Sequence, residues 1–495
     1  MGDPHPLLRP GDTCWRIETA DRLSVIVDAA NYFALLHDVM QKARHSVIMI
    51  GWEFDTRISL DPAKEEGGVP HRLGDFLGWL VRHRPGLEIR LLQWDVGLLG
   101  TLGRGSTPLR LADWFLGRKI RLKLDHAHPS GAAHHQKIIV IDDVLAFCGG
   151  IDATADRWDT HDHPDDSPYR VRPTSKRPYG PWHDATVAVG GGAARALGEL
   201  ARTRWAHATG ETVAPPPTVP PIWPEGLDTM LRNTEVGISR TMPAHAGREE
   251  VHEIESLYLA VIAAARRTLY IESQYFASRL LAEAIVARLA EPDGPEFVIV
   301  NPESAQGWLE EKAMGSARAQ LLEIVRKADV HGRFRIYTPV TAGECPIYVH
   351  AKIVIMDDRL MRVGSSNLNN RSLGFDTECD LSVEARPGAP GEANLRARIA
   401  GLRAELLAEH LGVTAKAVED AVEAADGSLL GAIEALRGRG RSLIPFEPPD
   451  FGAVEDALLR ENDLLDPERP ARRWRRGRLR ALRQRVFGAR TPKAA

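Results

Sequence analysis

Apolar positions along the chain recur at two spacings, one typical of helices and one typical of buried strands. Residues 31–43 carry apolar side chains at helical intervals, and residues 47–50 form a short apolar run. The same alternation continues with a helix at 73–81, a strand at 87–92, a helix at 108–116 and a strand at 120–124. Helices that alternate with short apolar strands predict an α/β fold in which a mixed sheet is covered by helices.

A second series with the same order follows later in the chain. After a strand at 186–189 and a helix at 193–205, residues 214–224 contain six prolines, which predict a stiff linker over 214–230. We then expect a helix at 248–265, a strand at 269–271, a helix at 279–290, a strand at 297–300, a helix at 306–327 and a strand at 334–337. The repeat predicts two similar lobes, 10–213 and 231–395. Helical spacing after residue 396 predicts a small helical appendix over 396–468, to which we assign no chemistry.

Each series ends in the same motif, H-x-K-x4-D. The first copy contains His135, Lys137 and Asp142, and the second contains His350, Lys352 and Asp357. A β-branched run follows each lysine and predicts a buried strand, so that each histidine and its lysine, two positions apart, face the same side. Each aspartate lies seven positions after its histidine and should face the other side. We therefore expect that neither aspartate orients its own histidine.

The similarity extends beyond the two motifs. Asp152 follows His135 by seventeen positions, and Asn367 follows His350 by the same number. Upstream, residues 43–50 parallel residues 265–272. Two motif copies with matched flanks indicate shared chemistry rather than coincidence.

These motifs resemble those of the phospholipase D superfamily, whose signature is two H-x-K-x4-D motifs at one active site. The resemblance covers about residues 10 to 410 and is strongest with the phospholipases D proper. It rests on the following stretches: Gly149-Gly150-Ile151-Asp152, Arg157-Trp158-Asp159-Thr160, Pro181-Trp182-His183-Asp184, Ile271-Glu272-Ser273-Gln274-Tyr275-Phe276 and Gly364-Ser365-Ser366-Asn367. It implies two phospholipase D-like lobes with the active site at their interface. Because one chain carries both motifs, we expect a monomer.

Two histidines and two lysines suit a phosphate diester. A neutral imidazole can attack phosphorus while a protonated imidazole gives its proton to the departing alcohol. The family's usual order makes His135 the nucleophile and His350 the acid, although the sequence fits either assignment. Lys137 and Lys352 would hold the non-bridging oxygens, so the chemistry requires no metal or other cofactor. Calcium dependence is left open.

Further polar residues complete the expected site. Ser365 and Asn367 supply neutral donors for the phosphate or substrate, whereas Asp152 occupies the equivalent place in the first lobe and makes the site asymmetric. Asp184 and Glu378 each begin a predicted strand after their motif, so each could lie beside its own histidine and orient it. The alternative is that both are ordinary strand-start acids.

Three other groups of residues have structural interpretations. Asp142 and Asp357 could close a turn as readily as take part in catalysis, and His134 should be structural. The polar, proline-containing loop between Asp152 and Pro181 is a candidate lid. Its stretch 161–166 alternates His and Asp and could ligate a metal, but we expect a solvated loop.

Composition limits the class of protein. The four cysteines lie far apart, with no C-x-x-C pattern, and no window approaches the roughly 20 apolar residues that a membrane span needs. We expect a cytoplasmic protein with peripheral membrane contact. The net charge is −4, but residues 469–495 contain ten Arg, one Lys and no acid, so the rest of the chain has a charge of −15. This basic tail could lie in a lipid interface or be solvated and disordered.

The favoured function is that of a phospholipase D that cleaves glycerophospholipids such as phosphatidylcholine and transfers the phosphatidyl group to alcohols as a side reaction. A phosphatidyltransferase of the cardiolipin-synthase kind is the first alternative. A nuclease or nucleic-acid binder is the second, although the acidic charge outside the tail makes a poor surface for a polyanion.

Overall fold

The computed structural model describes residues 5–64, 67–95, 119–304, 315–447 and 466. The strands of the first half are β1 (Arg16–Val27), β2 (Ser46–Gly51), β3 (Glu88–Trp94), β4 (Ile120–Asp125), β5 (Ile138–Ile141), β6 (Leu145–Gly149), β7 (Trp182–His183) and β8 (Ala185–Gly190). Those of the second half are β9 (Leu231–Met242), β10 (Val251–His252), β11 (Thr268–Glu272), β12 (Glu296–Val300), β13 (Phe334–Val340), β14 (Tyr348–Val349), β15 (Ile353–Met356), β16 (Leu360–Gly364), β17 (Glu378–Glu384) and β18 (Ser442–Pro445).

The helices cover both faces of the main sheet, which contains all of these strands except β7 and β14. They are α1 (Ala29–Met40), α2 (Leu73–His83), α5 (Gly191–Thr209), α6 (Glu253–Ala264), α7 (Arg279–Leu289), α9 (Ser316–Ala328), α10 (Asn370–Gly374), α11 (Glu392–Leu411), α12 (Ala415–Ala424) and α13 (Leu429–Leu436). The predicted α/β class is therefore confirmed.

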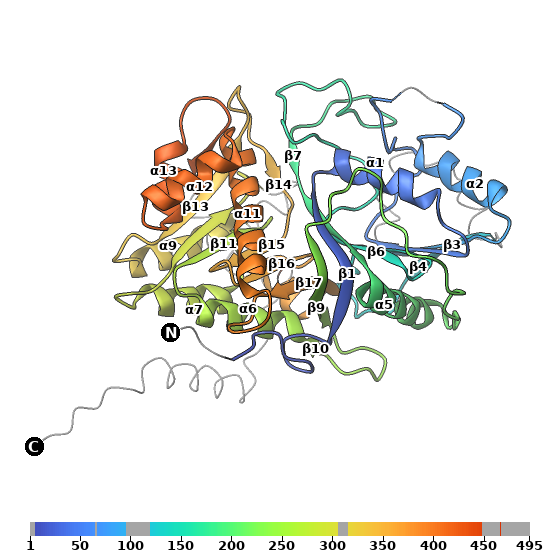
Figure 1. Cartoon of the computed structure of the whole chain (residues 1–495), viewed down its shortest axis with the longest axis horizontal. Helices are drawn as coiled ribbons and strands as arrows, with labels where there is room; N and C mark the ends of the chain where they lie inside the picture. Colours follow the sequence, from blue (N-terminus) through green and yellow to red (C-terminus); the bar gives the residue numbers. More distant parts are fainter. Residues whose placement is uncertain (1–4, 65–66, 96–118, 305–314, 448–465, 467–495) are drawn as a thin grey trace, which may run out of the picture.

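One mixed sheet of 16 strands runs through both halves of the described chain (Figure 1). In the first half the order is β4-β3-β2-β5-β6-β8-β1, and in the second it is β13-β12-β11-β15-β16-β17-β9. The two series meet where β1 pairs with β9 in antiparallel register. These two long central strands therefore join the mixed sheets of the two halves edge to edge.

The hydrophobic core has the same plan in each half. On one face of the sheet, α5 of the first half and α11 of the second pack in a continuous core that includes Trp205 and Leu407. On the other face, α1 and α2 cover the first half, while α6, α7 and α9 cover the second. Arg202 of α5 pairs with Asp143, and Arg403 of α11 pairs with Asp358. Because both helices pack on the same face of the sheet and pair an arginine with the second aspartate of a motif turn, α11 is the counterpart of α5.

The segment expected to be a helical appendix is thus partly integral to the fold. α11 lies in the core, and β18 extends the sheet by pairing with β13. Residues 214–230 contain no helix or strand and connect α5 to β9. The predicted helix at 108–116 and the basic tail at 469–495 lie outside the described residues, as does most of 306–315.

Candidate active site

The two motif histidines each bind a carboxylate from the other half of the chain. Nδ1 of His135 lies 3.0 Å from both carboxylate oxygens of Glu378. Nδ1 of His350 lies 2.6 Å from Oδ2 of Asp184. All four side chains are buried or nearly so. Each carboxylate therefore fixes one ring nitrogen and leaves Nε2 as the nitrogen available to a substrate.

Pairing of chain segments across the two halves explains this exchange of partners. His134 forms a parallel bridge with Thr377, and the amide of His135 donates to the carbonyl of Thr377. In the same way β14 pairs in parallel with β7, and the amide of His350 donates to the carbonyl of His183. The expectation that each acid lies beside its own histidine is wrong, because each motif approaches the strand start of the opposite half.

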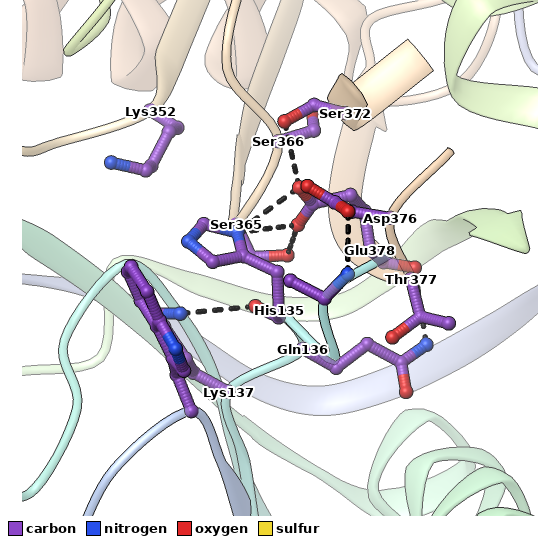
Figure 2. A network of polar contacts seen from close by, with 12 residues as sticks. His135, Gln136, Lys137, Lys352, Ser365, Ser366, Ser372, Asp376, Thr377 and Glu378 are labelled. Atoms are coloured by element: carbon purple, nitrogen blue, oxygen red, sulfur yellow. Dashed lines mark hydrogen bonds and ion pairs between the residues drawn. The ribbon is translucent and has the colours of Figure 1, made fainter. Parts of the chain in front are cut away.

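Two hydroxyl groups hold the carboxylate of Glu378. Ser365 Oγ donates to Oε2, and Ser372 Oγ donates to Oε1 at 2.7 Å. Figure 2 shows both serines directed at this carboxylate, which the His135 ring also faces. Ser365 Oγ also accepts the amide of Cys379 at 3.1 Å. The hydroxyl of Ser365 thus positions Glu378, and its contact with phosphate stays a prediction.

The two motif lysines lie in the same site but have different surroundings. Lys137 Nζ lies 3.1 Å from Oδ2 of Asp152 and donates to the carbonyl of His135 at 3.0 Å. Lys352 Nζ donates to the carbonyl of His350 and lies 3.5 Å from Oε1 of Gln274. Asp152 thus holds Lys137, and its carboxylate is unsuited to the substrate-binding role predicted for it, since phosphate is also an anion.

Asn367 has the surroundings expected of a substrate-binding amide. Its side chain is buried, and Oδ1 has no hydrogen-bond partner among the described residues. The amide could rotate to present its N–H groups to a phosphate oxygen. Its predicted role is therefore compatible with the structure and stays a prediction.

Burial and charge set the protonation of the site. Burial, followed by Lys137 and Lys352, holds the pKa of His135 well below its usual range. Burial, followed by Lys352 and Arg157, does the same to the pKa of His350. Burial also raises the pKa of Glu378 to about 8 and that of Asp184 to about 6, and it lowers the pKa of Lys352 to about 7. Neutral imidazoles suit a nucleophile, and the charge of a bound phosphate would favour protonation of the second ring.

Asp142 and Asp357 lie away from both histidines and fix the fold. Each is the first of two consecutive aspartates with positive φ in a tight hairpin turn, for which Asp is favoured. The carboxylate of Asp142 accepts the amides of residues 44–46 at 2.7–2.8 Å. That of Asp357 accepts the amides of residues 266–268 at 2.6–2.8 Å. The structural alternative holds, and their inclusion among the catalytic residues is corrected.

Aromatic side chains flank the two imidazoles, and sequence reasoning did not assign them to the site. The ring of Trp52 lies 5.4 Å from that of His135, and the ring of Trp182 lies 5.3 Å from that of His350. Trp182 stacks on Tyr348 and has the guanidinium of Arg157 on its ring at 4.5 Å. A cleft of about 240 Å³ opens beside Trp182 and Tyr348. Trp52 lies directly after β2 and outside both motif copies, so the motifs did not predict that it belongs to the site.

Part of the loop between Asp152 and Pro181 is buried instead of solvated. His163 is 1% exposed, and its Nδ1 lies 2.9 Å from Oδ2 of Asp159. Arg170 is also buried and donates to the same carboxylate. The expectation of a solvated stretch over 161–166 is wrong at His163, where an internal ion-pair network compensates the charge. The other five residues of that stretch are exposed, as expected. His134, as expected, lies outside the site, 2.9 Å from Asp125.

Several known proteins are similar to this chain in sequence. A family model described as "Cardiolipin synthase, PLD-like domain" matches residues 258–393. Phospholipase D A of Dictyostelium discoideum is 25% identical over 80% of this chain and 36% of its own length. Phospholipase D alpha 4 of Arabidopsis thaliana is 22% identical over 84% of this chain and 68% of its own length. The chain thus spans from about one third to two thirds of these two relatives.

A solved structure has a similar fold. The phosphatidylserine synthase of Haemophilus influenzae Rd KW20 matches 91% of this chain and 97% of its own, with a TM-score of 0.54 and 11% sequence identity. The two motifs, the family model and the relatives together support membership of the phospholipase D superfamily. Within that superfamily its sequence is similar to those of the phospholipases D. Among the described residues, no helix is long and apolar enough to cross a membrane.

Proposed function

We propose that this chain is a phospholipase D that hydrolyses glycerophospholipids such as phosphatidylcholine to phosphatidic acid and the head-group alcohol. The observation that carries the proposal is the pair of imidazoles, each held at Nδ1 by a buried carboxylate of the other half. Two lysines lie in the same site, so cations are available to a phosphate diester.

The reaction proceeds in two displacements. Nε2 of His135 attacks phosphorus, the bond from phosphorus to the head-group oxygen breaks, and His350 gives that oxygen its proton. Water then loses a proton to His350 and attacks phosphorus, and the phosphorus–nitrogen bond breaks to release phosphatidic acid and neutral His135. Asp184 and Glu378 stabilise the rings in the required tautomers, while Lys137 and Lys352 bind the non-bridging oxygens.

A second candidate is a phosphatidyltransferase, in which a lipid alcohol replaces water in the second displacement. Two matches favour it: the family model carries the description of cardiolipin synthase, and the solved structure with a similar fold is a phosphatidylserine synthase. The same first displacement serves both reactions, so the candidates differ only in the acceptor.

Product analysis with two acceptors tests both candidates. Purified full-length protein is incubated with phosphatidylcholine vesicles in buffer containing ethanol, and the lipids are separated by mass. A phospholipase D releases choline and forms phosphatidic acid together with phosphatidylethanol. A dedicated transferase forms little phosphatidic acid and needs a lipid alcohol, such as phosphatidylglycerol, for turnover.

Matched variants make the result specific to the proposed site. His135→Asn and His350→Asn should each remove nearly all choline release, because the mechanism needs both rings. His83→Asn serves as the control, since His83 lies exposed at the end of α2. Release of half the choline by either single variant would indicate two independent sites.

We also propose that residues 469–495 hold the enzyme at anionic membranes. The support is their charge and the spacing of Leu479, Leu482, Val486 and Phe487 among arginines. Each basic residue near an anionic surface contributes about 1 kcal/mol. A chain ending at Asp466 should bind phosphatidylserine vesicles more weakly and hydrolyse a monomeric short-chain lipid at the same rate. Equal vesicle binding by both chains would exclude the tail as the anchor.

A further inference from the structure

Four buried side chains meet next to the active site but take no part in the proposed reaction. They are Asp28 before α1, His163 in the loop, His183 in β7 and Glu409 in α11. Their ligand atoms all lie within 4.8 Å of one another. Oε1 of Glu409 lies 2.6 Å from Nδ1 of His183 and 2.9 Å from Nε2 of His163. Two imidazoles and two carboxylates, a common donor set for divalent metals, thus converge on one point.

The carboxylate of Asp28 is the least satisfied group of this cluster. The residue is fully buried, and neither oxygen makes a hydrogen bond with any residue that the structure describes. Its nearest ring nitrogens are Nδ1 of His183 at 3.5 Å, Nδ1 of His161 at 3.8 Å and Nε2 of His163 at 3.9 Å. A buried carboxylate that lacks hydrogen bonds is costly, so its direction into the cluster indicates a missing cationic partner.

The far nitrogens of both histidines are held by carboxylates outside the cluster. Nδ1 of His163 lies 2.9 Å from Oδ2 of Asp159, and Nε2 of His183 lies 2.8 Å from Oε2 of Glu272. Metal-binding histidines commonly have this arrangement, in which a carboxylate accepts the proton of one nitrogen and directs the other at the metal. The ring orientations required of a metal site are therefore already fixed.

We propose that Asp28, His163, His183 and Glu409 bind one divalent transition-metal ion, for which Zn²⁺ is the best match. Neutral imidazoles and two carboxylates carry a charge of −2, which a divalent ion neutralises. When bound, the ion replaces the protons of the hydrogen bonds between the two imidazoles and Glu409. His161 connects this buried cluster to the protein surface, since its side chain is 51% exposed and its Nδ1 lies 2.7 Å from Oε2 of Glu409.

The role of this ion is structural. It joins α11 to two segments of the first half that support His350. The carbonyl of His183 accepts the amide of His350 at 2.8 Å, and the amide of Asp28 donates to the carbonyl of Asp184 at the same distance. The ion would therefore stabilise the strand start from which Asp184 reaches His350. It has no contact with the phosphate in this account, so the proposal is independent of the proposed lipid hydrolysis.

Metal content and unfolding temperature test the proposal without an activity assay. Full-length protein is stripped with 1,10-phenanthroline, exposed to excess Zn²⁺, desalted, and measured by mass spectrometry of the elements. We expect one Zn²⁺ per chain and a higher unfolding temperature than that of the stripped protein. Asp28→Asn and Glu409→Gln should lose the ion, whereas Glu405→Gln, one turn earlier on α11 and exposed, should retain it.

Cobalt gives a readout on the unaltered chain if a variant fails to fold. Co²⁺ loaded into the stripped protein should give the visible absorption of a nitrogen- and oxygen-ligated ion at one equivalent. The proposal is overturned if the reloaded protein holds no stoichiometric metal and Zn²⁺ leaves its unfolding temperature unchanged. It is also overturned if folded Asp28→Asn and Glu409→Gln both retain the full equivalent, which would place the ion elsewhere.

Discussion

Nδ1 of His350 lies 2.6 Å from the carboxylate of Asp184, a residue that precedes it by 166 positions and belongs to the other half of the sheet. His135 and Glu378 have the reciprocal relationship. Removal of either half would therefore take away one imidazole and the carboxylate that orients the other. The active site depends on both halves not only for its two histidines but for the protonation of each.

The roles of the two carboxylates can be separated by the leaving group. Asp184→Asn should lower turnover of phosphatidylcholine by roughly 100-fold or more, because a neutral amide stabilises the protonated His350 ring poorly. With a phosphatidyl p-nitrophenyl ester the loss should be much smaller, since nitrophenolate leaves without a proton. Glu378→Gln, which acts on the nucleophile, should impair both substrates. Equal losses on both substrates for Asp184→Asn would contradict the assignment of His350 as the acid.

Asp142 and Asp357 should affect stability rather than chemistry. In Asp142→Asn and Asp357→Asn the new side chain still tolerates positive φ. Its NH₂ group, however, would face at least one backbone N–H that donates to the carboxylate in the original protein, so that hydrogen bond is lost. We expect each variant to lose roughly 1–3 kcal/mol of stability. Denaturant unfolding measures this loss, and kcat per folded chain should stay within a few-fold of the original. A loss of kcat comparable to that of His135→Asn would restore a catalytic role.

The pH dependence should reveal the buried lysine. Burial lowers the pKa of Lys352 to about 7, and its protonated form is the one that binds phosphate. The value of kcat/KM, which reports on the free enzyme, should therefore fall as the pH rises through about 7. Lys352→Arg stays charged, so its remaining activity should lack this alkaline decline. An unchanged decline in that variant would assign the titration to another group.

Gly150 is predicted to be essential for the position of Asp184. A Cβ atom at this position would lie 2.1 Å from Oδ1 of Asp184, so Gly150→Ala must displace the carboxylate that orients His350. We expect turnover to fall by at least tenfold, together with a lower unfolding temperature. Gly180→Ala is the matched control, because nothing lies within 4 Å of a Cβ there. Similar turnover in both variants would show that Asp184 need not be held in this place.

Periodicity in the sequence predicted the elements that have uniformly apolar faces. β2, β3 and α2 begin and end within a few residues of their expected bounds, because most of their buried positions are apolar. The two longest strands, β1 and β9, were not predicted. They carry charged residues such as Glu18 and Arg232 within partly exposed stretches, which weakens the apolar signal.

The sequence predicted which residues form the candidate site better than it predicted the contacts between them. The repeated motif identified His135 and His350, and the strand starts that follow each motif suggested Asp184 and Glu378. The structure brings these four residues together in pairs. The exchange of acids between halves depends on β-bridges between distant segments, which local spacing does not encode. Likewise the matched spacing of Asp152 and Asn367 indicated equivalent places but not that Asp152 would bind Lys137.

The most direct test of the central claim is to trap the covalent intermediate on one histidine. His350→Asn protein is mixed with the phosphatidyl p-nitrophenyl ester, which needs no general acid, and is quenched within one turnover. We predict a burst of one nitrophenolate per chain and an acid-labile phosphatidyl adduct that peptide mass spectrometry locates on His135, because hydrolysis of the adduct needs His350. No burst and no adduct, or an adduct on a residue other than His135, would contradict a shared site in which His135 is the nucleophile and His350 the acid and base.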